Sequence, residues 1–375
     1  MNKNTIKSFG KIILVIVFLY LFLVSIGLMG TAFKGFGKGF AENLLNTTSN
    51  PFVGLFIGIL ATSLVQSSST TTSIVVGMVA SGVITVGNAV PIIMGANIGT
   101  TVTNTLVSLG HITRREEFRR AIAGATVHDF FNLICVAIFF PLELATGFLQ
   151  KLATQLSTAF VNFGGIKFTS PIKMATKPAI NLIKDIFTKS LDFPHNISYI
   201  LILIVSVVVM YFSLFLIVKL MKSLVIKRTE ATLDAVLGKS GLIGITAGLI
   251  FTIIVQSSSI TTSLLIPMIG AGIITIELAF PITMGANIGT TATAILASLA
   301  TGNPAAITIA FVHFLFNAIG VTFIYPIRVF RRIPISLAKK LGELSFRKRR
   351  YALIYVASVF FIIPSLLIVI SKCFK

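Results

Sequence analysis

Gln66-Ser67-Ser68-Ser69 occurs a second time as Gln256-Ser257-Ser258-Ser259, 190 residues further along the chain. The sequence around the motif is repeated as well, because residues 54–103 and 244–293 are identical at 27 of 50 positions when aligned at this offset. The shared positions include a second motif, MGANIGTT, at 94–101 and at 284–291. Such a match within one chain indicates an internal duplication, in which each unit carries both motifs.

The composition is typical of a membrane protein. The 375 residues are 55% hydrophobic and 11% charged, with a mean hydropathy of +0.97, whereas soluble domains are about a quarter charged. The net charge of +20 lies in short segments between apolar ones, so it indicates orientation in the membrane and not a nucleic-acid partner. Three segments are long enough to cross about 30 Å of hydrocarbon as helices, namely Ile12–Gly30, Ile197–Val218 and Tyr351–Ile370.

Each Gln-Ser-Ser-Ser motif lies between two apolar runs that are too short to cross a membrane separately. Residues 52–65 precede the first motif, and the run that follows it ends at Val86. We therefore predict a re-entrant helical hairpin with the polar motif at its tip. Such a tip is tolerated at membrane depth only when it is buried in protein or lines an aqueous cavity. The duplication predicts a second hairpin over residues 241–276.

The second motif predicts a broken helix in each unit. Residues 89–109 and 278–300 are long enough to cross the membrane, but both contain the Gly-Ala-Asn-Ile-Gly-Thr-Thr stretch, and Pro91 precedes it in the first unit. Proline and glycine interrupt the helical hydrogen-bond ladder. Continuous helices are expected over residues 121–141 and 305–326.

Basic segments predict how the chain is oriented. Residues 111–120 and 328–350 are rich in Arg and Lys, so we expect them on the cytoplasmic side together with the N-terminus. The first hairpin then enters from outside and the second from the cytoplasm. This inverted repeat is found in many secondary transporters, whose substrates bind near the midplane between the halves.

The expected divisions follow from this topology. They are an N-terminal helix and exterior linker (1–50), the first unit (51–142), an exterior loop with short amphipathic helices, a connecting helix and a cytoplasmic linker (143–240), the second unit (241–327), and a basic cytoplasmic loop with a C-terminal helix (328–375). Cys135 and Cys373 lie in or beside apolar segments far apart in the sequence. The sequence therefore predicts neither a disulfide framework nor a cysteine metal cluster.

Hairpin tips and helix breaks expose backbone groups that lack helical partners. Helix N-termini offer free N–H groups and a partial positive charge, so a facing pair forms an anion site without arginine. Successive Ser hydroxyls add donors and acceptors, while unwound carbonyls and side-chain oxygens suit a hard cation such as sodium. The candidate sodium ligands are Gln66, Gln256, Thr71, Thr261, Asn97, Asn287, Thr100, Thr290 and Asp129.

A single Ser-rich run in a membrane helix is more often a packing or back-bonding feature than a binding site. Packing of small residues does not explain why Gln66, Gln256, Asn97 and Asn287 recur with the same flanking residues. Amide side chains are costly in lipid. The duplication therefore favours the binding site.

Asp129 is an acidic residue within a predicted span, and Phe314 occupies the matching position of the second unit. An intramembrane carboxylate is a candidate for cation binding or coupling, with a structural partnership as the alternative. His128 and its counterpart His313, each followed by an Asn one turn later, favour hydrogen bonds between helices. A Ser-His-Asp hydrolase triad can be written from these residue types, but the sequence has no nucleophile elbow.

The chain resembles the type II sodium-dependent phosphate cotransporter family. The resemblance rests on both Gln-Ser-Ser-Ser motifs, both Gly-Ala-Asn-Ile-Gly-Thr-Thr motifs and the segment Phe118–Asn132, which reads FRRAIAGATVHDFFN. It implies sodium-coupled phosphate uptake by alternating access. It also implies a role for Asp129, because Asp occupies the matching position in electrogenic members. The residues that the resemblance assigns to phosphate are Ser67, Ser68, Ser69, Ser257, Ser258 and Ser259.

Vertebrate members of this family carry a large disulfide-bearing exterior loop, and the corresponding loop here has no cysteine. We therefore expect a bacterial-type member in the inner (plasma) membrane, with sodium as the coupling ion and no cofactor. Without the resemblance, sulfate or a dicarboxylate fits the anion site equally well. A channel would need a continuous pore, and a scaffold would leave the repeated polar residues unexplained. The oligomeric state, including a homodimer, stays open.

Overall fold

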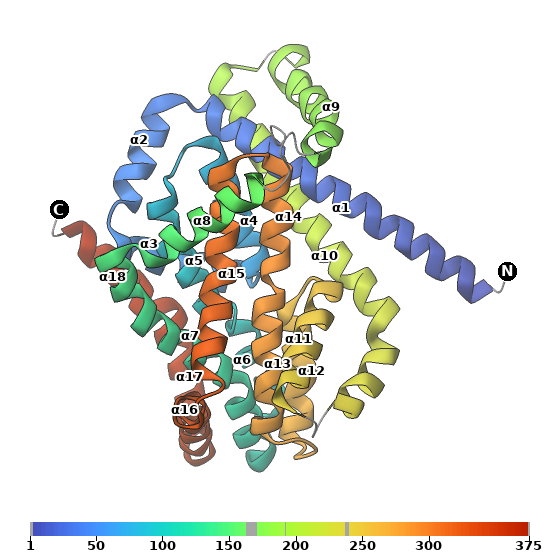
Figure 1. Ribbon diagram of the computed structural model, residues 1–375, viewed down its shortest axis with the longest axis vertical. Coiled ribbons are helices and arrows are strands. Elements are labelled where there is room, and N and C mark those ends of the chain that lie inside the picture. Colours follow the sequence, from blue (N-terminus) through green and yellow to red (C-terminus); the bar gives the residue numbers. More distant parts are fainter. Residues whose placement is uncertain (1–2, 163–170, 192, 237–239, 374–375) are drawn as a thin grey trace.

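A computed structural model describes residues 3–162, 171–191, 193–236 and 240–373, and every regular element within these ranges is a helix (Figure 1). Seven helical segments are long and apolar enough to cross a membrane. The prediction of an all-α polytopic membrane protein is therefore confirmed. The seven segments are Ser8–Gly35, Val86–His111, Arg115–Thr146, His195–Leu224, Ile276–Thr301, Pro304–Ile324 and Arg350–Ser371.

Each Gln-Ser-Ser-Ser motif joins two short helices. In the first unit these are α3 (Pro51–Val65) and α4 (Ser68–Ser81), and in the second they are α11 (Gly241–Val255) and α12 (Ser258–Gly270). At the start of helix α3, the Asn50 side chain accepts a hydrogen bond from the Phe52 N–H, and Pro51 occupies the first helical position. Both features are favoured at helix starts. Its 15 residues extend about 22 Å at 1.5 Å per residue, less than the hydrocarbon thickness.

The MGANIGTT motif is more regular than its composition predicts. Helix α5 (Val86–Gly99) contains Pro91 and the whole Gly-Ala-Asn-Ile-Gly stretch, and α6 (Val102–Ser108) begins three residues after it ends. The break is confined to Thr100 and Thr101, whose backbone angles stay in the helical region. In the second unit only Thr290 separates α13 (Ile276–Gly289) from α14 (Thr291–Thr301). Each predicted broken helix is therefore interrupted only at the threonines that end the motif, and the proline and glycines before them stay helical.

Close packing explains the glycines of this motif. A Cβ atom on Gly95 would collide with the Leu55 carbonyl oxygen of α3, and one on Gly58 would collide with the Ile92 carbonyl oxygen of α5. Gly285 of α13 has the same relation to the carbonyl oxygen of Ile245 in α11. Small residues at such positions let membrane helices approach closely. In each unit the glycines fix the first hairpin arm against the helix that follows the hairpin.

The two units share one hydrophobic core. It includes the fully buried rings of Phe22, Phe131, Phe280 and Phe316, which come from α1 (Lys3–Gly35), α7 (Arg115–Thr146), α13 and α15 (Pro304–Ile324). Helix α10 (His195–Val236) packs along α1, and both lie on one side of the bundle (Figure 1). The units are thus packed into a single body and are not separate lobes.

Several connecting segments are helical where linkers were expected. Residues 31–50 hold the end of α1 and α2 (Gly37–Thr48), and the expected basic loop is α16 (Arg328–Arg347), which lies at the opposite end of the molecule from α9 (Figure 1). Helix α16 forms because its apolar residues lie on one face and pack against α7. The remaining elements are η1 (Leu109–His111), α8 (Phe148–Asn162), α9 (Pro171–Asp185), η2 (Ile186–Ser190), α17 (Arg350–Ala357), η3 (Ser358–Ile362) and α18 (Ile363–Cys373).

Candidate substrate site

The two Gln-Ser-Ser-Ser motifs line one cavity. Its volume is about 430 Å³, and its polar wall consists of residues 66–70 from the first hairpin tip and residues 256–259 from the second. Helix α10 supplies an apolar wall that includes Tyr211, Leu214 and Phe215. Two motifs that are 190 positions apart in the sequence therefore meet at one place in the structure.

Each hairpin turns at its glutamine. Gln66 has a backbone φ of 55° and Gln256 one of 58°, and these are the non-glycine residues with positive φ in the part of the chain that the structure describes. The Gln66 N–H donates to the Thr62 carbonyl oxygen and the Gln256 N–H to that of Thr252, both at 2.7 Å. The left-handed region is strained for a residue with a side chain. Strain of this kind concentrates at functional sites.

The serines that follow begin the second arm of each hairpin. Ser67 Oγ accepts a hydrogen bond from the Thr70 N–H at 3.2 Å, and Ser257 Oγ accepts one from the Ile260 N–H at 3.3 Å. Both hydroxyl protons remain available for donation. The N–H groups of Ser68 and its neighbour open the first turn of α4 and have no acceptor within the helix. Two helix N-termini with hydroxyl groups thus converge on one cavity, which suits an oxyanion.

Side-chain hydrogen bonds through Thr293 connect the two hairpin tips. Thr293 of α14 donates from Oγ1 to Gln256 Oε1 at 2.9 Å, and Ser69 Oγ lies 3.4 Å from Thr293 Oγ1. Gln256 Nε2 also donates to the Ile253 carbonyl oxygen at 2.6 Å. Thr293 was not among the residues predicted from the sequence. The duplication could have identified it, because Thr103 occupies the same position after the first MGANIGTT motif.

The four threonines predicted as sodium ligands are buried and do not line the cavity. Thr71 Oγ1 donates to the Ser67 carbonyl oxygen at 3.2 Å, and Thr261 Oγ1 lies 2.7 Å from the hydroxyl oxygen of Thr252. The hydroxyls of Thr100 and Thr290 donate to carbonyl oxygens one turn earlier in their own helices. Their oxygens keep lone pairs that could coordinate a cation.

Asn97 and Asn287 belong to a buried polar network between the two units. Asn132 of α7 donates to the Asn97 carbonyl oxygen at 2.8 Å and accepts from Asn287 Nδ2 at 3.0 Å. Asn97 Oδ1 accepts from Asn317 Nδ2 at 3.0 Å and lies 3.3 Å from His313 Nε2. These contacts tie α5, α7, α13 and α15 together. The expected hydrogen bonds between helices are present at His313 and at both of the repeated asparagines on α7 and α15.

Asp129 is fully buried on α7 and lies outside the cavity lining. The polar side chains that face its carboxyl group are Thr101, at the break after α5, and Tyr355 of α17. Within the described residues, neither carboxyl oxygen makes a hydrogen bond, and the same holds for the Tyr355 hydroxyl and both ring nitrogens of His128. A buried carboxylate without close hydrogen bonds needs a paired cation to stay charged. Asp129 therefore keeps its place as a candidate for cation binding.

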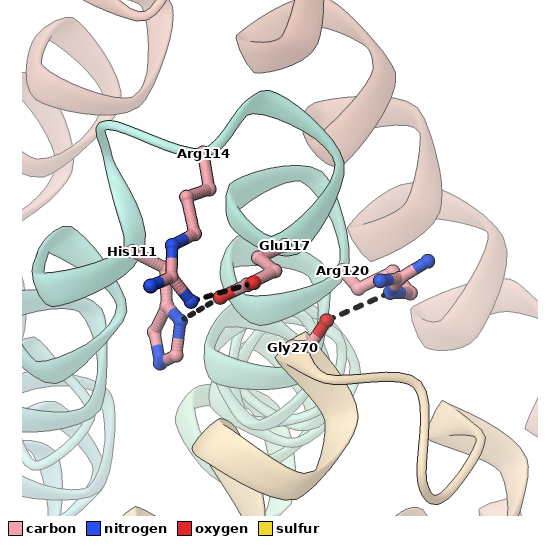
Figure 2. A network of polar contacts seen from close by, with 5 residues as sticks. All are labelled: His111, Arg114, Glu117, Arg120 and Gly270. Atoms are coloured by element: carbon pink, nitrogen blue, oxygen red, sulfur yellow. Dashed lines mark hydrogen bonds and ion pairs between the residues drawn. The ribbon is translucent and has the colours of Figure 1, made fainter.

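The basic end of the molecule holds the second hairpin in place (Figure 2). Arg120 of α7 donates from Nε to the Gly270 carbonyl oxygen, at the end of α12, at 2.8 Å. Beside it, Glu117 accepts from Arg114 Nη1 at 2.9 Å and lies 3.1 Å from His111 Nδ1. A residue of the first unit thus hydrogen-bonds to the end of the hairpin that carries the second Gln-Ser-Ser-Ser motif.

The fold and the cavity define a polytopic helical membrane protein in which two repeated hairpins present their polar tips to one another. The chain belongs to the Na+/Pi-cotransporter family, whose model matches residues 21–171 and 200–339. The match includes both hairpins, both MGANIGTT motifs and Asp129.

Curated relatives agree with this assignment. The chain is 36% identical over 447 residues to sodium-dependent phosphate transport protein 2B of Homo sapiens, with 96% of this chain and 65% of that protein covered. It is also 36% identical over 431 residues to sodium-dependent phosphate transport protein 2A of Rattus norvegicus, covering 96% of this chain and 68% of the relative. The chain thus spans about two thirds of the length of these relatives. No solved structure matches it significantly.

Proposed function

We propose that this protein takes up inorganic phosphate by sodium-coupled secondary active transport with alternating access. The observation that carries the proposal is the convergence of both Gln-Ser-Ser-Ser tips on one polar cavity of about 430 Å³. The relatives named above are sodium-dependent phosphate transport proteins. Transport, and not enzymatic turnover, is also the activity that fits a pair of duplicated membrane hairpins.

The serines are the proposed phosphate ligands. The opening N–H groups of α4 and α12 provide donors and a partial positive charge, and the six hydroxyls can donate to phosphate oxygens. No arginine or lysine is among the described residues that line this cavity, so the anion would be held by dipoles. Binding of this kind is weak enough to permit release, as a carrier requires. The residues are Ser67, Ser68, Ser69, Ser257, Ser258 and Ser259.

Sodium coupling is assigned to the oxygen atoms beside the tips. Gln66 and Gln256 face the cavity itself, and Asp129 offers the carboxylate that would favour a cation most strongly. The other proposed ligands are Thr71, Thr261, Thr100, Thr290, Asn97 and Asn287. In a membrane, the basic ends predict a cytoplasmic N-terminus, and we place this multi-pass protein in the inner (plasma) membrane.

Alternating access follows from the repeated architecture. Two homologous units that enter the bilayer from opposite faces can exchange conformations, which exposes the site to each side in turn. The polar network around Asn97 and the Arg120–Gly270 contact lie where the units would shift against one another. Such contacts can be remade in the second conformation.

Uptake of labelled phosphate into proteoliposomes tests the proposal. An inward sodium gradient should drive accumulation, and replacing sodium by potassium should abolish it. Unlabelled phosphate should compete, whereas sulfate and succinate should not, and competition by either would assign the carrier to another anion. Gln66→Ala and Gln256→Ala should abolish uptake in well-folded protein. Gln150→Ala, which removes an amide from α8 away from the cavity, should retain it.

A further inference from the structure

A second cavity with a different character lies between α1 and α9. It has a volume of about 220 Å³ and is lined by three lysines, Lys34 of α1 and Lys173 and Lys177 of α9. Thr31 and Asn181 add a hydroxyl and an amide to its wall, and none of the lining residues that the structure describes is acidic. Helix α9 lies at the end of the molecule opposite α16 (Figure 1), which is the exterior end in the predicted topology.

The sequence places these groups on facing sides of two helices. Lys173 and Lys177 are four residues apart on α9, with Asn181 four residues further on, so all three lie on one helical face. On α1, Gly30 precedes Thr31 and Lys34 on the same face. A Cβ atom on Gly30 would have no neighbouring atom within 4 Å. The missing side chain of Gly30 therefore leaves room in the cavity.

The three ammonium groups have no partner in the described part of the chain, where none of them makes an ion pair or a hydrogen bond. By contrast, Lys189 pairs with Asp185 at 3.2 Å just beyond this face. The lysines are also not needed as helix caps for α4, which ends beside the cavity. The Ala80 carbonyl oxygen accepts from Asn303 Nδ2 at 2.9 Å, and other carbonyls there accept backbone N–H groups.

We propose that this cavity binds a phosphate group. The three lysines are exposed and line one opening, and one oxyanion with several acceptor oxygens can accept from more than one of them while using the hydroxyl and amide. Free inorganic phosphate is one source of the group, in which case the inference rests on the proposed transport function. A phospholipid headgroup is the other source, because α9 also exposes Met174 and Leu182, which suit a bilayer surface.

The position of the cavity connects it with the substrate site. Helix α4 starts at Ser68 in the candidate substrate cavity and lines the lysine cavity with Ala80, one residue before it ends. Helix α14 carries Thr293 near its start and reaches the lysine cavity at Thr301. The 14 residues of α4 span about 20 Å at 1.5 Å per residue. Phosphate bound at the lysines would be concentrated one helix length outside the serine site.

The first test combines Lys34→Gln, Lys173→Gln and Lys177→Gln in one variant. In phosphatidylcholine vesicles at low ionic strength, removal of the three charges should raise the KM for phosphate about tenfold and leave kcat unchanged. The difference should fall below about twofold at high choline chloride, since salt screens exposed charges. Lys184→Gln, on the same helix but outside the cavity, is the matched control and should behave as wild type.

Gly30→Leu separates a binding site from a diffuse positive field, because it fills the cavity and keeps every charge. A site predicts that Gly30→Leu raises KM as the triple variant does. If the triple variant changes KM and Gly30→Leu does not, the proposal is wrong. If the source is a lipid headgroup, both variants should lose activity only in vesicles that contain phosphatidylglycerol, and no effect in either lipid would also overturn the proposal.

A binding measurement keeps this test independent of transport. In detergent, inorganic phosphate or short-chain phosphatidylglycerol should raise the Tm of a Ser67→Ala, Ser257→Ala double variant, in which the serine site is impaired. The stabilisation should vanish when the three lysines are also replaced. Its persistence would contradict the proposal, whereas a wild type that binds here but takes up no phosphate would refute only the transport function.

Discussion

Replacing Gln66 by glycine separates the role of its side chain from the role of its backbone. Its φ of 55° costs a residue with a side chain roughly 1–2 kcal/mol, and glycine removes this cost. Glycine also makes the unfolded chain more flexible, which offsets about 0.4–1 kcal/mol. Since the Gln66 side chain makes no hydrogen bond to the described residues, Gln66→Gly should gain up to about 1.5 kcal/mol of stability.

Gln256→Gly provides the comparison. Its backbone is equally strained, with a φ of 58°, but its side chain accepts from Thr293 and donates to the Ile253 carbonyl oxygen. Two lost hydrogen bonds cost about 0.5–1.5 kcal/mol each, so this variant should be less stable than wild type by roughly 1 kcal/mol.

Thermal unfolding in detergent and sodium-driven phosphate uptake should be measured on the same preparations. Gln66→Gly should unfold at the wild-type temperature or up to about 3 °C above it, yet take up no phosphate. That combination would show that a strained glutamine is kept for its side-chain oxygen and nitrogen. Uptake near the wild-type level by a stable Gln66→Gly protein would refute the reasoning, because the turn alone would then account for the motif.

Three further predictions follow from the packing, the buried carboxylate and the topology. Gly95→Ala should destabilise the protein by about 1–3 kcal/mol, because the added Cβ meets the α3 backbone. Gly39→Ala is the control, since Gly39 has open space around it, and it should not destabilise the protein. Equal unfolding temperatures for the two variants would contradict this packing account. Asp129→Gly should keep sodium-dependent uptake but lose its response to a membrane potential clamped with potassium and valinomycin. Each net charge that crosses 100 mV is worth about 2.3 kcal/mol, so the loss is measurable. A response as strong as that of wild type would show that Asp129 does not make transport voltage-dependent. In a background without native cysteines, a Cys at Lys340 should react with a membrane-impermeant maleimide only from the cytoplasm and one at Lys173 only from outside, and the reverse pattern would overturn the inverted repeat.

The duplication made much of the candidate site predictable. Gln66 and Gln256 could be assigned to equivalent hairpin tips because the same polar residues recur between the same short apolar runs. The structure brings both tips to one cavity. Comparing the two copies therefore predicted equivalent positions that neither copy indicates alone, and the same comparison identifies Thr293 through Thr103.

Other features were not predictable from local sequence. Gly95 reads as a helix breaker, but the backbone of α3 lies so close that only glycine fits there, and a single chain segment does not reveal its packing partner. Residues 328–347 read as a basic loop because their charges dominate, yet Ile335 and Leu341 are buried on one face of α16. The lysine cavity depends on how α9 is placed against α1, which the sequence pattern does not specify.

Reciprocal coupling of the two solutes tests the central claim most directly. Proteoliposomes with equal sodium on both sides and phosphate added only outside should accumulate labelled sodium inside, because a symporter must move sodium with phosphate in either direction. Gln256→Ala should abolish this phosphate-driven sodium movement. The account predicts sodium accumulation that depends on phosphate and is saturable, whereas sodium flux that is indifferent to phosphate would show a leak or channel and contradict it.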